Sequence, residues 1–167
     1  MPLSMSQIAV PAFDRGLTAF AAVLTKSEQH PGFGKIEPAL LQARLFPDMF
    51  HFTRQVQIAA DFAKGTTARL SGVEPPSYPD DEASFADLRA RLERTLAFVR
   101  SIPAESIDGS ERRVVTLKTG GREMTFEGQP YLMHFALPNF YFHLATAYDI
   151  LRHNGIALGK RDFIGEF

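Results

Sequence analysis

The sequence predicts an all-α protein: a four-helix bundle with a short extra helix and a small β-hairpin before the last helix. Three observations lead to this prediction. Four long segments carry apolar residues at the spacing of one helix face. A stretch before the last segment changes to alternating and β-branched residues, which is typical of a hairpin. With 167 residues, of which 45% are hydrophobic, the chain can bury a real core, and we expect one domain over 1–167.

The first helix is expected over 6–27, with Ser4 or Ser6 as its N-cap, because a hydroxyl there can accept a free backbone N–H. Pro11 lies either in the first turn of a helix that starts later or at a kink inside an earlier one. A short helix over about 38–45 follows, since the proline at its start suits a first helical turn.

The second long helix is expected over 48–70, with Gly72 as its stop, since glycine favours the left-handed conformation after a helix. Its apolar body carries three polar groups: His51, Gln55 and Asp61. We expect Asp61 to be exposed or ion-paired, because an unpaired buried carboxylate is costly, and Arg15 on the first helix is one candidate partner.

The third long helix is expected over 85–100, with Ser84 as its N-cap. A single turn over 103–108 leads into the hairpin at 113–126, whose strands are joined by a Thr-Gly-Gly turn. The tail over 159–167 is expected either to be a loose end or to dock through its aromatic side chains, Phe163 and Phe167.

The last helix, expected over 129–154, is the most apolar and aromatic-rich long segment. Asn139, His143 and Thr146 lie at i, i+4 and i+7, so they form a polar stripe on one face. With two residues of the second helix, this stripe is the candidate ligand pocket: Asn139, His143, Thr146, His51 and Gln55. The competing interpretation is a satisfied buried network that fixes helix register without chemistry.

Two further residues of the last helix, Tyr141 and Tyr148, share a second face. They are expected to pack with their hydroxyls at a rim or at a dimer seam.

Composition excludes several classes of function. No cysteine means no disulfide, no thiolate metal ligand and no cysteine nucleophile, and it fits a cytoplasmic protein. A net charge of −1 gives no electrostatic reason to expect nucleic acid or a membrane surface as partner. We expect no signal peptide, because the first residues lack a basic region and a small-residue cleavage site. The sequence also contains no long uninterrupted apolar run, no phosphate-binding loop and no nucleophilic serine motif.

Two runs, PDMFHFTRQVQIAADFAKG (47–65) and FALPNFYFHLATAYDILRHNGIALGKRDFIG (135–165), resemble the uncharacterised family called domain of unknown function 1993. The resemblance extends over nearly the whole chain. That family is grouped with the DinB/YfiT-like superfamily of metal-dependent four-helix bundles. The resemblance implies an up-down-down-up bundle and a homodimer. Characterised relatives include metal-dependent thiol transferases and a maleylpyruvate isomerase.

The metal motif of that superfamily is three histidines, one on the second helix and two at i, i+4 on the last. His143 matches the second of the last pair, Asn139 stands where the first would be, and His51 best matches the second-helix position. The chain keeps at most two of the three histidines. The resemblance therefore implies a degenerate metal site.

We accordingly expect an uncharacterised DinB-like protein without a cofactor that binds a small ligand or a partner as a homodimer. One alternative is a divalent-metal-dependent hydrolase or thiol transferase that holds zinc or nickel on His51 and His143. Another is a purely structural dimerising module without a ligand pocket. Whether the protein is an enzyme stays open.

Overall fold

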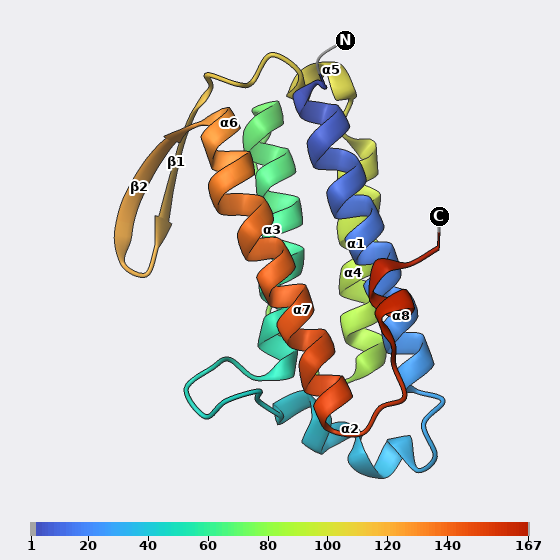
Figure 1. The fold of residues 1–167 in the computed structure, drawn as a ribbon. Helices are drawn as coiled ribbons and strands as arrows, with labels where there is room; N and C mark the ends of the chain where they lie inside the picture. Colours follow the sequence, from blue (N-terminus) through green and yellow to red (C-terminus); the bar gives the residue numbers. More distant parts are fainter. Residues whose placement is uncertain (1–2, 167) are drawn as a thin grey trace.

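A computed structural model describes residues 3–166, and its four long helices pack side by side as an up-down-down-up bundle (Figure 1). These helices are α1 (Met5–Ser27), α3 (Phe52–Ser71), α4 (Phe85–Ser101) and α7 (Leu137–His153). α1 and α7 run in one direction, and α3 and α4 run in the other (Figure 1). The predicted fold class is confirmed, including the hairpin before the last helix.

Short elements connect the long helices: α2 (Phe33–Gln42), α5 (Ala104–Ile107), β1 (Val114–Thr119), β2 (Arg122–Glu127), α6 (Gly128–Pro130), the π-helix η1 (Tyr131–Ala136) and α8 (Lys160–Ile164). β1 and β2 form one antiparallel hairpin, in which Val115 pairs with Phe126. α2 begins earlier than the predicted 38–45, and Pro38 lies inside it. The helix tolerates this proline because the carbonyl four residues earlier, on exposed Gly34, can reach water.

The start of α3 corrects a second prediction. The helix begins at Phe52 rather than near residue 48, because residues 46–49 form a turn closed by the bond from Met49 N–H to the Phe46 carbonyl, at 3.0 Å. His51 is the N-cap, and its Nδ1 accepts the Arg54 backbone N–H at 3.4 Å. The His51 side chain thus lies at the helix entrance instead of on the helix face.

The last helix is continuous from α6 to α7, as predicted, but its second segment is a π-helix. Leu137 N–H donates to the Leu132 carbonyl, five residues back. Pro138 then supplies no donor, and the side-chain Nδ2 of Asn139 donates to the Phe135 carbonyl at 2.7 Å. The π-helix, whose turn is wider than that of an α-helix, therefore ends just before Pro138, the position where the helix lacks a backbone N–H donor.

α7 packs mainly against α3 and also contacts α1. A close approach to α1 occurs at Gly16, where a Cβ would lie 2.7 Å from Cε1 of Phe140. The Phe140 ring is fully buried and meets Phe13 edge-on, with 5.0 Å between the ring centroids. This contact places the middle of α7, which carries His143, firmly in the bundle.

Because α3 and α4 are parallel, residues 72–84 must return along the bundle, and Arg91 of α4 fastens this crossover. Its guanidinium, 1% exposed, donates to Glu82 at 2.9 Å and to the Pro79 carbonyl at 3.0 Å. It also pairs with Asp61 of α3 at 2.9 Å and with Asp80 at 3.0 Å. Asp61 is thus ion-paired, as one alternative predicted, but to Arg91 rather than to Arg15.

Arg15 instead donates from Nε to the carbonyl of Ile164 in α8, at 3.1 Å. α8 docks on α1, where Lys26 bonds Asp162 at 2.8 Å, and Phe163 packs edge-on against Tyr148 of α7. The docked alternative for the tail is therefore correct over its described part. Phe167, named with it, lies outside the described residues.

Within residues 3–166, α1 is long and apolar enough to cross a membrane when judged by length and composition alone. It contacts α3, α4, α7 and α8, and its fully buried residues include Phe13 and Leu17, as expected for a core helix of a bundle. The expectation that the chain has no membrane partner stays a prediction.

Candidate functional site

The polar centre of the α3–α7 interface is a hydrogen bond between Gln55 and His143. His143 Nδ1 lies 2.6 Å from Gln55 Oε1, and the two residues are 8% and 1% exposed. The other end of the amide, Nε2, donates to the Phe50 carbonyl at 3.0 Å. Because that bond makes Nε2 the donor, Oε1 can only accept, and His143 Nδ1 must carry the hydrogen.

Aromatic rings enclose His143. Phe62 of α3 stacks on the imidazole with 6.0 Å between ring centroids, and Phe142 meets it edge-on at 5.2 Å. Burial, together with the positive charge of Arg54, lowers the pKa of His143 to about 4. The ring is therefore neutral at neutral pH. Its hydrogen is on Nδ1, so Nε2 presents a lone pair.

This lowered pKa has a consequence for stability. In the unfolded chain the pKa of His143 has its ordinary value of 6.5, whereas in the native chain it is about 4. Between these values the unfolded state binds more protons, so we expect the free energy of unfolding to fall as the pH is lowered from 6.5 to 4. At about 1.4 kcal/mol per pKa unit, the loss is at most about 3 kcal/mol.

Urea unfolding at a series of pH values measures this slope. The carboxyl groups with lowered pKa, such as Asp14 and Asp162, contribute only below about pH 5, where their unfolded forms begin to bind protons. His143→Gln, which cannot titrate, serves as the control and should flatten the dependence between about pH 5 and 6.5. An equally steep slope in this variant would assign the effect to other groups.

The other predicted pocket residues do not join this hydrogen bond. Asn139 directs its amide to its own helix, at the Phe135 carbonyl, and Thr146 is buried without a hydrogen bond to Gln55 or His143. His51 is linked through the backbone, since the Gln55 N–H donates to its carbonyl at 3.0 Å. The structure thus joins Gln55 to His143, and the remaining three residues lie one helical turn away from one or the other along α3 and α7.

The donor set does not match a three-ligand metal site. Within the described residues 3–166, no three His, Cys, Asp or Glu side chains cluster in a way that could hold an ion. Asn139 stands at the position of the first α7 histidine of the motif, and its Nδ2 donates a hydrogen bond to the Phe135 carbonyl of the same helix. Two histidines remain, and His51 already uses Nδ1 as a helix cap.

Sequence reasoning missed three residues around His143: Phe62, Phe142 and Arg54. Phe62 had a usable signal, because it lies seven residues after Gln55 and so on the same helix face. Phe142, half-exposed beside a buried histidine, becomes informative only once burial is known. Nothing in the sequence indicates that Arg54 lies near His143, because only the packing of α3 against α7 brings the two side chains together.

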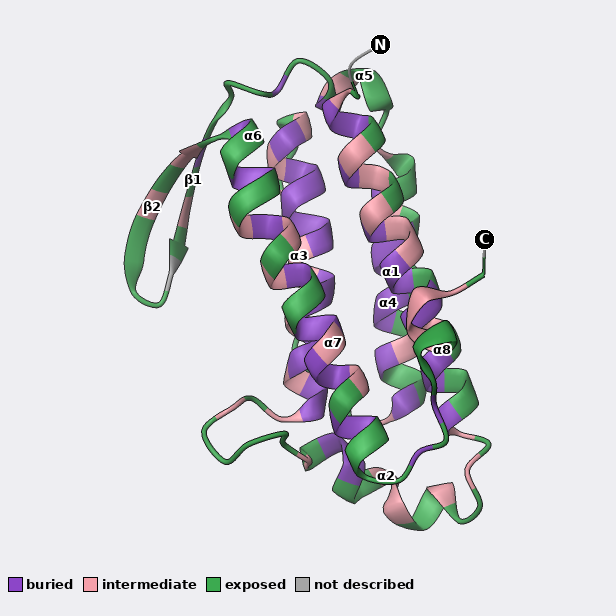
Figure 2. Cartoon of the chain, viewed as in Figure 1, coloured by how far each residue is buried: buried purple, intermediate pink, exposed green. Residues whose placement is uncertain are grey.

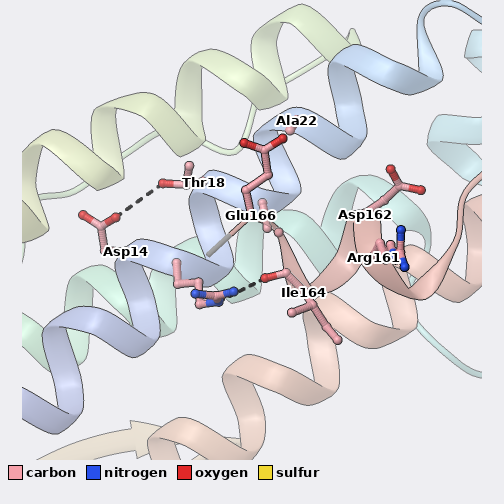
Figure 3. A pocket seen from close by; sticks show the side chains of 10 residues that line it. Asp14, Thr18, Ala22, Arg161, Asp162, Ile164 and Glu166 are labelled. Atoms are coloured by element: carbon pink, nitrogen blue, oxygen red, sulfur yellow. Dashed lines mark hydrogen bonds between the residues drawn. The ribbon is translucent and has the colours of Figure 1, made fainter.

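A pocket of about 820 Å³ lies elsewhere, between α1 and α8 (Figure 3). Asp14, Arg15 and Asp162 contribute to its lining, and each is already bonded, to Arg100, to the Ile164 carbonyl and to Lys26 respectively. None of the five predicted pocket residues lines it.

Comparison with known proteins supports the interpretation of the fold. The family model described as domain of unknown function (DUF1993) matches residues 5–164. A solved structure of a DinB family member protein from Shewanella denitrificans is 33% identical, with a TM-score of 0.84 over 97% of this chain and 92% of that chain. None of the curated proteins matches the chain.

Proposed function

We propose, from the premise that the chain belongs to the DUF1993 family and has a DinB-like bundle, that it binds a small ligand at His143 and acts as a homodimer. The observation that carries the proposal is the Gln55–His143 hydrogen bond, which holds a neutral imidazole with its lone pair on Nε2. Gln55 is itself fixed by the Phe50 carbonyl, so the acceptor is held in one orientation.

The surroundings of the imidazole define the class of ligand. A hydroxyl or N–H group on the ligand would donate to Nε2, because a neutral imidazole with its hydrogen on Nδ1 can only accept there. Phe62 and half-exposed Phe142 offer ring faces and edges to an adjoining flat, apolar part. An anionic ligand gains little, since His143 carries no positive charge near pH 7.

Phenol combines these two features and serves as the probe. We expect titration of phenol into protein with ¹⁵N-labelled histidine to shift the Nε2 resonance of His143 in a saturable way. His143→Ala should abolish saturable phenol binding, measured on the neighbouring Phe62 ring, whereas the exposed His153→Ala should leave it unchanged. Circular dichroism verifies that both variants are folded.

A His143 resonance that phenol leaves unmoved would contradict this site, and so would equal phenol binding by His143→Ala and the unmodified chain. The homodimer is a separate part of the proposal, and its support is the apolar outer side of α7.

The alternative is a divalent-metal-dependent hydrolase or thiol transferase. One observation favours it: a histidine that ligates metal through Nε2 commonly donates its Nδ1 hydrogen to an oxygen, as His143 does to Gln55. His51 accepts a bond at Nδ1, so its neutral ring carries the hydrogen on Nε2, and it would have to give up this helix cap to ligate a metal through Nε2. Stoichiometric zinc or nickel in chelator-free protein, lost in His143→Ala, would contradict the metal-free proposal and support the metal site of this alternative.

A further inference from the structure

The segment from 128 to 148, which forms α6, η1 and most of α7, contains no Asp, Glu, Lys or Arg. A helix buried on all sides could lack charges for that reason alone, but this one has an outer side that is exposed (Figure 2). Phe142 is 54% exposed, Tyr141 43% and Met133 41%. Exposed aromatic and methionine side chains on a segment that carries no charged residue of its own are typical of an interface core.

The exposed side has a regular spacing. Its midline follows steps of four, three, four, three and four residues: His134, Pro138, Tyr141, Ala145, Tyr148 and Arg152. None of these six residues is buried. Alternating steps of three and four residues are the pattern with which one helix packs along another.

The order of these steps is the same in both directions along the helix. If a second copy of α7 packs antiparallel to the first, each midline residue therefore lies opposite a midline residue of the second copy. The alignment places Tyr141 against Ala145 of the second copy, and Pro138 against its Tyr148. A large side chain then faces a smaller one at each central level, as close packing of two helices requires. Complementarity to itself is the reason to choose a second copy over an unrelated partner.

Charge favours the same arrangement. Asp149 and Arg152 lie at one end of the exposed side, and the other end is uncharged back to Glu127. Antiparallel packing keeps the two Arg152 residues at opposite ends, with each facing His134 of the other copy. Parallel packing would place Arg152 against Arg152 and Asp149 against Asp149, which costs free energy.

We propose that the homodimer forms by antiparallel, two-fold packing of α7 on α7, centred between Tyr141 and Ala145. This placement rests on the homodimer of the proposed function. Phe142 flanks the midline and contacts the His143 ring, at 5.2 Å between centroids, so the interface borders the candidate ligand site. Phe163 of α8, packed on Tyr148, borders it on the α1 side.

Light scattering coupled to size exclusion tests the placement on the full chain. We expect a mass twice the 18.6 kDa of one chain for the unmodified protein, and the single-chain mass for Ala145→Glu, which places a charge at the centre of both copies. Ala97→Glu makes the same change on the exposed side of α4 and should stay dimeric. Circular dichroism verifies that both variants are helical.

The two parts of the proposal fail in different ways. An unmodified chain with the mass of one copy would contradict the homodimer itself. A dimeric, folded Ala145→Glu variant would leave the homodimer standing and overturn its placement on α7.

Disulfide formation tests the register, because the chain has no cysteine of its own. Tyr141→Cys and Ala145→Cys are prepared separately, mixed and oxidised. We expect the mixture to form a linked dimer much more than either variant alone, since residues 141 and 145 face each other only across the two-fold axis. Equal linkage in all three samples, or none in the mixture, would overturn the antiparallel register.

Discussion

Replacing Arg91 by methionine is expected to lower the free energy of unfolding by about 3 kcal/mol, because the substitution removes the cation shared by three carboxylates. Glu82, with a side chain 4% exposed, would lose its bond to Arg91 at 2.9 Å and keep a buried charge. Asp61 and Asp80 retain contact with water, at 37% and 44% exposed, which places the loss at the lower end of the usual range.

Urea unfolding measures this loss, and Arg100→Met is the matched control. Arg100, on the same helix, pairs with Asp14 at 2.5 Å, but its side chain is 56% exposed. Ion pairs of that kind contribute at most about 1 kcal/mol, so the control should remain close to the unmodified protein. If both variants lost the same stability, Arg91 would not be the residue that fastens the crossover over 72–84.

Replacing Gln55 by leucine is expected to cost about 1–3 kcal/mol of unfolding free energy, the usual cost of one unsatisfied buried polar group. Leucine has a similar volume but no polar atoms, so the buried His143 Nδ1–H loses its partner. The carbonyl of exposed Phe50 also loses its bond but can turn to water. Gln29→Leu, at an exposed position, makes the same chemical change and should stay within about 0.5 kcal/mol.

A second substitution at this position separates the two bonds. Gln55→Glu keeps an oxygen acceptor for His143 and adds a negative charge beside it, so we expect the pKa of His143 to rise from about 4. It removes the donor to the Phe50 carbonyl. Histidine NMR titration reads the pKa directly, and an unchanged value would contradict the contact between residues 55 and 143.

The sequence was sufficient to predict the bundle and the hairpin, because apolar periodicity and the Gly-Gly turn are local signals. Helix beginnings were less predictable. Pro38 and Pro47 suggested starts near 38 and 48, but Phe33 and Phe52 begin the helices, since turns and exposed carbonyls accommodate the prolines. One feature of the sequence was connected with the π-helix: Pro138 followed by Asn139. This pair could be interpreted only once the structure showed the bond from the Asn139 side chain to the Phe135 carbonyl.

Part of the candidate site was also within reach of the sequence. His143 and Gln55 were both predicted for the pocket, because each is a polar residue on an apolar helix face. The packing of α7 against α3 determines their direct hydrogen bond, the position of the hydrogen on His143 Nδ1 and the lowered pKa of His143. No local sequence pattern predicts this packing. The partner of Asp61 was mispredicted for the same reason. Arg91 and Arg15 both lie on helices of the bundle, and only the packing of these helices shows that Arg91 reaches Asp61.

The proposed ligand site requires a neutral His143, with its hydrogen on Nδ1 and its lone pair on Nε2. Two-dimensional NMR of ¹⁵N-labelled histidine side chains, recorded over a pH titration, tests this most directly. We expect a protonated Nδ1 and a bare Nε2 at pH 7, with a pKa of about 4. A hydrogen on Nε2, or a pKa near the ordinary value of 6.5, would contradict the acceptor geometry on which the proposed function depends.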